Sequence, residues 1–96
     1  MSRILVVTWI AKPGEEAEVE RVLQTMILRT RAEPGCERYE VLRSVENPRR
    51  FLLFESYTDD LALKTHTDSE YFQRYVIGEA VPRLESRERV SYQQVG

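Results

Sequence analysis

The residue whose surroundings best suit chemistry is a glutamate inside an apolar segment. Glu55 lies within residues 51–57, where the remaining side chains are mostly apolar. If this segment is a β-strand, its side chains alternate between two faces, and Glu55 shares a face with Leu53 and Tyr57. An isolated buried carboxylate is costly, so it must be paired, hydrogen-bonded, protonated or at a cavity mouth. Two interpretations stay open: a structural ion pair with an arginine of a neighbouring strand, such as Arg43, or a functional acid.

The single histidine is the second candidate. Histidine is the side chain best suited to proton transfer near neutral pH. His66 falls near the end of an expected short helix and is followed by Thr-Asp-Ser. It is either a catalytic base or a structural imidazole at a helix end. Because one histidine with scattered acids makes no metal-binding cluster, we expect no metal site.

Aromatic side chains from several segments could converge beside these two groups. A flat organic ligand is best held in a cleft lined by aromatic rings and a few polar groups. In a chain this small, each ring could equally be part of the core. The candidates are Trp9, Tyr39, Tyr57, Tyr71, Phe72 and Tyr75.

Other sequence signatures of catalysis are missing. The chain has no nucleophile motif, no glycine-rich phosphate loop and no dinucleotide fingerprint. Cys36 is the only cysteine, so no intrachain disulfide can form, and we interpret it as a small packed residue. An enzyme built on this chain is therefore expected to need no cofactor.

The first half of the chain predicts a strand, a helix and another strand. Residues 4–11 are apolar and β-branched almost throughout and end at Pro13-Gly14, which indicates a central strand. Apolar side chains then recur at three- and four-residue spacing through residues 19–30, the pattern of an amphipathic helix. Residues 33–35, Glu-Pro-Gly, end this helix. A second strand is expected over residues 38–45.

The second half repeats this order. A turn at residues 46–49 joins the second strand to a third at 51–57, which makes a hairpin. Capping residues at 58–60 precede a short helix over 61–66. Ser69 is expected to cap a further helix, which Gly78 and Pro82 break. Residues 88–95 alternate as a closing strand.

The resulting order, β-α-β-β-α-β, predicts one ferredoxin-like α+β domain over residues 1–96. The two helical segments cover one face of the sheet. The other face also carries apolar side chains from the first and third strands, and no helix is left to cover it. We therefore expect a homodimer that packs these open sheet faces together.

Composition excludes several other classes of protein. The net charge is −2, with 14 basic and 16 acidic residues interspersed, so no positive stripe suited to nucleic acid is present. No segment approaches the length of a membrane span, and the apolar N-terminal stretch is too short for a secretion signal. We expect a cytoplasmic protein that binds neither nucleic acid nor membrane.

Several stretches taken together resemble the antibiotic-biosynthesis-monooxygenase domain. The Glu-Pro-Gly-Cys turn and the Glu-x-Tyr strand, followed by His-x-x-Ser-x-Tyr-Phe, are fairly specific in combination. The resemblance covers nearly the whole chain. It rests on residues 11–15, on 31–36 with Tyr39, on 51–57, and on His66 with Ser69, Tyr71 and Phe72.

This resemblance implies a dimeric α+β barrel with a pocket between sheet and helices in each subunit. Similar members oxidise quinols or polycyclic anthrones with molecular oxygen and use neither metal nor flavin. By the same resemblance, His66 is the base or its positioner, and Glu55 orients or polarises the substrate. The implied substrate-binding residues are Tyr39, Tyr57 and Phe72, with Trp9 as a further candidate from the first strand.

The asparagine and tryptophans of the anthrone-oxidising pockets are not reproduced, because Asn47 lies in a turn and Tyr57 stands where tryptophan is frequent. The chain is more similar to short quinol-oxidising and signal-molecule-isomerising members. We therefore expect a cofactor-independent monooxygenase that acts on a small quinol-like or polycyclic phenolic compound. The alternatives are an isomerase or cyclase that works by proton transfer, and a non-catalytic dimer that binds a small ligand.

Overall fold

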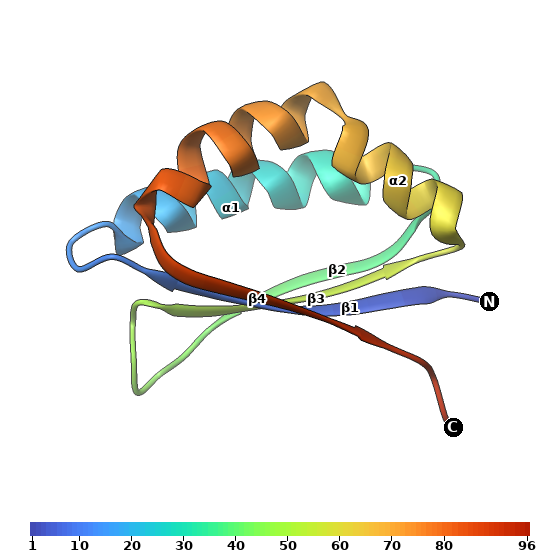
Figure 1. Cartoon of the computed structure of the whole chain (residues 1–96), viewed down its shortest axis with the longest axis horizontal. Coiled ribbons are helices and arrows are strands. Elements are labelled where there is room, and N and C mark those ends of the chain that lie inside the picture. The colour runs from blue at the N-terminus through green and yellow to red at the C-terminus, as the bar shows by residue number, and fades with distance from the viewer.

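The computed structural model describes residues 1–96, and its centre is a four-stranded antiparallel sheet (Figure 1). The strands are β1 (Arg3–Ala11), β2 (Cys36–Arg43), β3 (Arg50–Tyr57) and β4 (Leu84–Tyr92), in the order β2-β3-β1-β4. The apolar first strand is therefore central, as predicted. The polar last strand lies at an edge, where one side of its backbone faces no neighbouring strand. This topology confirms the ferredoxin-like α+β fold.

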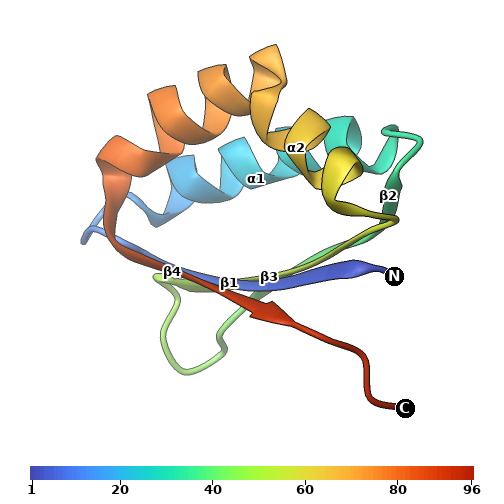
Figure 2. The ribbon, with the colours of Figure 1, turned by 45° about the vertical axis from the view of Figure 1, so that its right-hand side comes forward.

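The helices all cover one face of this sheet (Figures 1 and 2). They are α1 (Glu16–Arg31), α2 (Asp60–Asp68), the π-helix η1 (Phe72–Ala80) and a short 3₁₀ turn, η2 (Val81–Arg83). As expected from the capping residues, Asp59 accepts a hydrogen bond from the Ala62 amide at 2.8 Å and starts α2. None of the helices is long and apolar enough to cross a membrane.

The core fills the space between the helices and the inner face of the sheet. On α1 the apolar stripe predicted from the sequence is buried, and on β1 and β3 every second side chain is buried with it. This alternation fixes the face of each strand residue, so that Glu55 points inward with Leu53 and Tyr57. The main core residues are Leu5, Val7, Trp9, Val19, Val22, Leu23, Met26, Phe51 and Leu53.

No helix covers the opposite face of the sheet (Figure 2), which carries apolar side chains. By alternation, β3 presents Leu52 and Phe54 there, and their register partners Thr8 and Val6 on β1 lie beside them. Leu52 is 36% exposed although it lies in the middle of the sheet. A partly apolar sheet face of this kind is normally covered by a second layer.

Three predicted boundaries were wrong. β2 ends at Arg43, so Val45 is an exposed turn residue and not part of the strand. η1 continues through Gly78, which the wider i→i+5 hydrogen bonding of a π-helix accommodates. β4 runs over Leu84–Tyr92 and so begins and ends earlier than the predicted 88–95. Its limits are set by hydrogen-bonded pairing with β1, and not by the weak alternation of polar and apolar residues in its own sequence.

Candidate functional site

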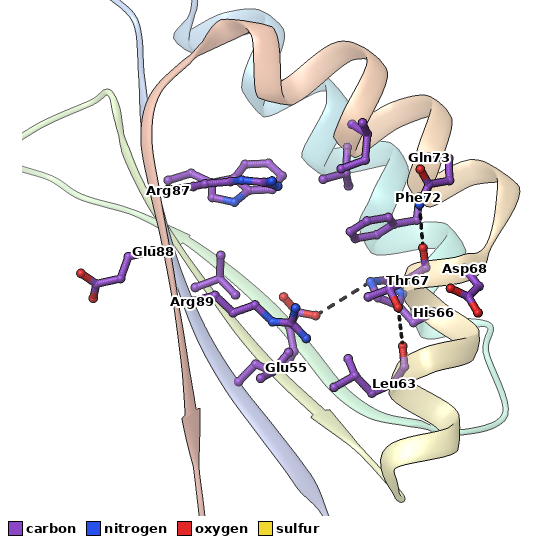
Figure 3. A pocket seen from close by; sticks show the side chains of 15 residues that line it. Glu55, Leu63, His66, Thr67, Asp68, Phe72, Gln73, Arg87, Glu88 and Arg89 are labelled. Carbon is purple, nitrogen blue, oxygen red and sulfur yellow. Dashed lines mark hydrogen bonds and ion pairs between the residues drawn. The ribbon is translucent and has the colours of Figure 1, made fainter.

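A pocket of about 490 Å³ lies between the inner face of the sheet and the helices α2 and η1 (Figure 3). This volume suits a small organic molecule. The strands β1, β3 and β4 form its floor and one wall, and α2 and η1 form the other. Its lining residues are Leu5, Val7, Trp9, Glu55, Leu63, His66, Thr67, Asp68, Phe72, Gln73, Val76, Ile77, Arg87, Glu88 and Arg89.

Glu55 lies at the floor of this pocket and is only 6% exposed. Its Oε1 accepts a hydrogen bond from the Tyr57 hydroxyl at 2.6 Å. Burial raises the pKa of the Glu55 carboxyl above its ordinary value, and the Tyr57 hydrogen bond opposes this shift. The suggested ion pair with Arg43 was wrong. Arg43 instead binds Glu20 of α1 at 3.0 Å, so it does not pair with the buried carboxylate.

His66 reaches the same pocket from α2 and is 2% exposed. Its Nε2 lies 3.9 Å from Oε1 of Glu55, and its Nδ1 lies 3.0 Å from Oε2 of Glu33. Burial lowers the pKa of the His66 imidazole, an effect that nearby Glu55 opposes. His66 is therefore a neutral imidazole at neutral pH, and its Nε2, on the Glu55 side, can accept a proton when an ionised Glu33 accepts the hydrogen on Nδ1.

Glu33 is a member of the site that sequence reasoning missed. It belongs to the Glu-Pro-Gly turn after α1, and the sequence of that turn predicts only the end of the helix. Burial raises the pKa of its carboxyl to about 7. The signal that could have identified it is the position of a carboxylate in the turn that leads into β2. Only the packing of this turn against α2 brings it to His66.

Aromatic rings surround His66, as predicted, but not all of them line the pocket. The ring centroids of Tyr57 and Phe72 lie 5.2 Å from that of His66. Trp9 and Phe72 line the pocket, whereas Tyr39 and Tyr57 do not, with exposures of 2% and 0%. The correction has a geometric cause, because both tyrosines point into the core beneath α2. They hold His66 and Glu55 in place instead of contacting a ligand.

Two arginines of β4 also belong to the pocket and were not predicted. Arg87 and Arg89 are register partners of Trp9 and Val7, so they point to the inner face of the sheet. The strand predicted over residues 88–95 excludes Arg87. It also does not indicate which face of the sheet either arginine side chain points to. With the true register, period-two alternation assigns both arginines to the pocket.

The structure contains no group of three or more histidine, cysteine or acidic side chains that could hold a metal ion. Cys36 is half-buried at the start of β2, and burial beside Glu33 and Glu55 raises the pKa of its thiol to about 11. The thiol is therefore protonated at neutral pH, which makes it a poor nucleophile.

Comparisons with known proteins agree with this fold. Residues 2–77 match the family described as antibiotic biosynthesis monooxygenase. Rv0793 of Mycobacterium tuberculosis is 30% identical over 81 residues, which cover 82% of this chain and 79% of Rv0793. YcnE of Bacillus subtilis is 29% identical over 65 residues, which cover 68% of each chain.

Solved structures show the same architecture along the full chain. PA3566 from Pseudomonas aeruginosa has a TM-score of 0.91 and 27% identity, and the match covers 99% of this chain and 95% of that one. SO0527 from Shewanella oneidensis has a TM-score of 0.90 and 30% identity, and covers 97% of this chain and 90% of its own. The matched residues 2–77 include Glu33, Glu55 and His66, and the chain belongs to the antibiotic biosynthesis monooxygenase family.

Proposed function

We propose that this protein is a cofactor-independent monooxygenase that oxidises a small quinol-like or phenolic compound with molecular oxygen. The observation that carries the proposal is the buried pair of Glu55 and His66 at one end of a ligand-sized pocket. Membership of the family supports the reaction class. Trp9 and Phe72 supply the aromatic walls that a flat ring requires.

The first chemical step is removal of a phenolic proton. His66 Nε2 accepts the proton, and Glu33, hydrogen-bonded to Nδ1, holds the ring in the required orientation. The imidazolium that forms is stabilised by carboxylates on both sides, with Glu55 3.9 Å from Nε2. Tyr57 fixes the Glu55 carboxylate by its 2.6 Å hydrogen bond, so little rearrangement is needed during the transfer.

The second step is the reaction of the electron-rich ring with oxygen. The phenolate gives its electrons to O₂, and a carbon–oxygen bond forms at the ring carbon. The resulting peroxide anion takes up the proton held on His66 and becomes a hydroperoxide. The same ring carbon then loses its hydrogen as a proton while the O–O bond breaks, which leaves one oxygen atom on the carbon as a carbonyl and releases the other as water. A quinol is oxidised by four electrons to a hydroxyquinone in this way, and one O₂ molecule accepts all four.

We also propose that the protein is a homodimer joined through the open sheet face. The apolar side chains Leu52 and Phe54 of β3 lie there without cover from the chain's own helices. A sheet from a second subunit would cover this surface at the spacing of a β-sandwich. In that arrangement each subunit keeps its own complete pocket on the far side of its sheet.

The test is oxygen uptake by the metal-stripped protein with a panel of hydroquinones, with product masses measured in parallel. We expect uptake well above the uncatalysed rate, with one atom of labelled oxygen in the product. His66→Gln is expected to lower the rate about 100-fold, the usual contribution of a general base. Lys12→Gln, in the exposed β1–α1 turn, is the matched control.

The same proton transfer could instead serve an isomerase, which is the alternative that the Glu55–His66 pair also supports. That enzyme would convert its substrate at an equal rate under nitrogen, and its product would have the mass of its substrate. Turnover of this kind would refute the monooxygenase proposal while leaving the role of His66 intact. An absence of both oxygen uptake and turnover would favour a ligand-binding protein.

A further inference from the structure

The two arginines of β4 give the pocket a positive side that the proton transfer does not use. Figure 3 shows the side chains of Arg87 and Arg89 turned into the pocket from the edge strand. They lie at the levels of Trp9 and Val7, respectively, along the same strand pair. Arg89 is therefore nearer the Glu55 end of the pocket, and Arg87 is one step further along.

Neither guanidinium group forms an ion pair within the protein. Arg87 and Arg89 take part in no ion pair and no side-chain hydrogen bond, whereas half of the arginines of the chain do. Glu88, between them, is a register partner of Thr8 on the open side of the sheet, and Figure 3 shows it directed away from the pocket.

The acids that do line the pocket are already engaged elsewhere. Asp68 forms an ion pair with Lys64 on the outer surface of α2. Glu55 accepts the Tyr57 hydroxyl, and although the charge of Arg89 acts on its carboxyl, the two side chains form no ion pair. The β4 wall therefore carries two guanidinium groups that form no ion pair with an acid of the pocket.

We propose that Arg87 and Arg89 bind a carboxylate group on the aromatic substrate. A guanidinium presents a planar fork of donors that matches a carboxylate, and such charge-assisted hydrogen bonds are among the strongest available in proteins. Held from β4, the carboxylate fixes which way round the ring lies. The ring then packs between Trp9 and Phe72, with its phenolic group toward His66. The aromatic nature of the substrate rests on the proposed function, but the recognition of its charge does not.

The test is calorimetric titration under nitrogen with 2,5-dihydroxybenzoate and its neutral analogue 2,5-dihydroxybenzamide. The two compounds share ring, hydroxyl groups and size but differ in charge. We expect the wild-type protein to bind the benzoate more tightly. The variant with Arg87→Gln and Arg89→Gln should bind the benzoate about tenfold or more weakly, because it loses the charge-assisted hydrogen bonds to the carboxylate. Its affinity for the benzamide should change far less.

Controls separate charge recognition from general damage and from the proposed reaction. Lys12→Gln removes one positive charge outside the pocket and should leave both affinities unchanged. Added salt should weaken binding of the benzoate alone. If the wild-type protein showed no preference for the benzoate, or bound neither compound, the inference would be overturned. Because binding is measured without oxygen, this outcome would still allow the protein to oxidise neutral quinols. Binding of the benzoate without oxygen uptake would refute only the proposed monooxygenase activity.

Discussion

At the scale of single residues, the site is an imidazole held between two carboxyl groups. Glu33 approaches Nδ1 of His66 at 3.0 Å, and Glu55 lies 3.9 Å from Nε2. An ionised Glu33 accepts the Nδ1 hydrogen and so leaves the lone pair on Nε2, the nitrogen nearer Glu55. The protonation state of Glu33 therefore decides whether His66 can act as a base toward the ligand.

The first prediction concerns the pH dependence of turnover. Because the pKa of Glu33 is about 7, the rate should rise as the pH increases through that value. Glu33→Gln keeps a side chain that can accept the Nδ1 hydrogen but cannot titrate, so the step near pH 7 should disappear from the profile. We expect Glu33→Ala to lose more activity than Glu33→Gln, because only the latter can orient the ring. A step of unchanged position in Glu33→Gln would show that another group controls it.

The second prediction concerns stability. The pKa values of Glu33 and Glu55 are raised on folding, so the folded protein binds these protons more tightly than the unfolded chain. Their contribution to the free energy of unfolding is present below pH 4.5, the ordinary value, and is lost as the pH rises through the folded pKa. His66, whose pKa is lowered, contributes with the opposite sign.

Glu55→Gln removes one of these carboxyl groups but keeps an acceptor for the Tyr57 hydroxyl. The variant should gain thermal stability relative to wild type as the pH rises above 4.5, because ionisation of the buried Glu55, whose pKa is raised in the folded state, costs stability only in the wild type. Thermal unfolding at several pH values checks this difference. Glu46→Gln, in the exposed β2–β3 turn, should show no such gain. If the thermal stability of Glu55→Gln and that of the wild type changed equally with pH, the raised pKa of Glu55 would be contradicted.

At the scale of the elements, the site depends on how closely the turn after α1 packs against α2. Gly35 follows Glu33 by two residues, and a Cβ atom added there would lie 2.4 Å from Cβ of Ala62 on α2. Its carbonyl also accepts a hydrogen bond from the Thr58 amide at 2.9 Å. Glycine at this position therefore lets the turn that carries Glu33 contact the helix that carries His66.

The third prediction follows from this contact. Gly35→Ala should destabilise the fold by about 1–3 kcal/mol, the usual cost of overpacking, and should separate Glu33 from His66. Ala62→Gly combined with Gly35→Ala removes the clash and should restore part of the stability, less roughly 1 kcal/mol for glycine within a helix. Denaturant unfolding of the single and double variants measures both effects. Equal stability of Gly35→Ala and wild type would show that the helix moves without cost.

At the scale of the whole molecule, one chain leaves one side of its sheet without a second layer. Helices cover only the pocket side of the sheet, so the open face either contacts water or is covered by another subunit (Figure 2). The half-buried Phe54 and the partly exposed Leu52 lie at the centre of this face. A chain of 96 residues buries a comparatively small share of its surface, which increases the benefit of association.

The fourth prediction is that sedimentation velocity at micromolar concentration gives a dimer. Phe54→Glu places a charge in the centre of the open face and should shift the protein toward the monomer. Leu28→Glu, which changes a residue 76% exposed on the outer side of α1, should leave the dimer intact. A monomeric wild type, or dissociation by Leu28→Glu and not by Phe54→Glu, would contradict the proposed interface.

The sequence by itself determined the order of the elements, the strand face that Glu55 shares with Leu53 and Tyr57, and the presence of an apolar strand followed by an amphipathic helix. These features are local, because period-two and three-to-four-residue spacing record which side of each element is buried. The resemblance to the family was also readable from short motifs, and the match over residues 2–77 confirmed it. The lone histidine was recognised by its type, independently of its neighbours.

Only the tertiary structure decided which groups meet. Glu33 and His66 are 33 positions apart, and their contact depends on the packing of a turn against a helix, which no local pattern encodes. The pocket arginines depend on the register of β4 against β1, because a shift of one residue would turn both to the other face. Tyr39 and Tyr57 are predicted to bind the ligand, but tertiary packing beneath α2 buries them, and they do not line the pocket.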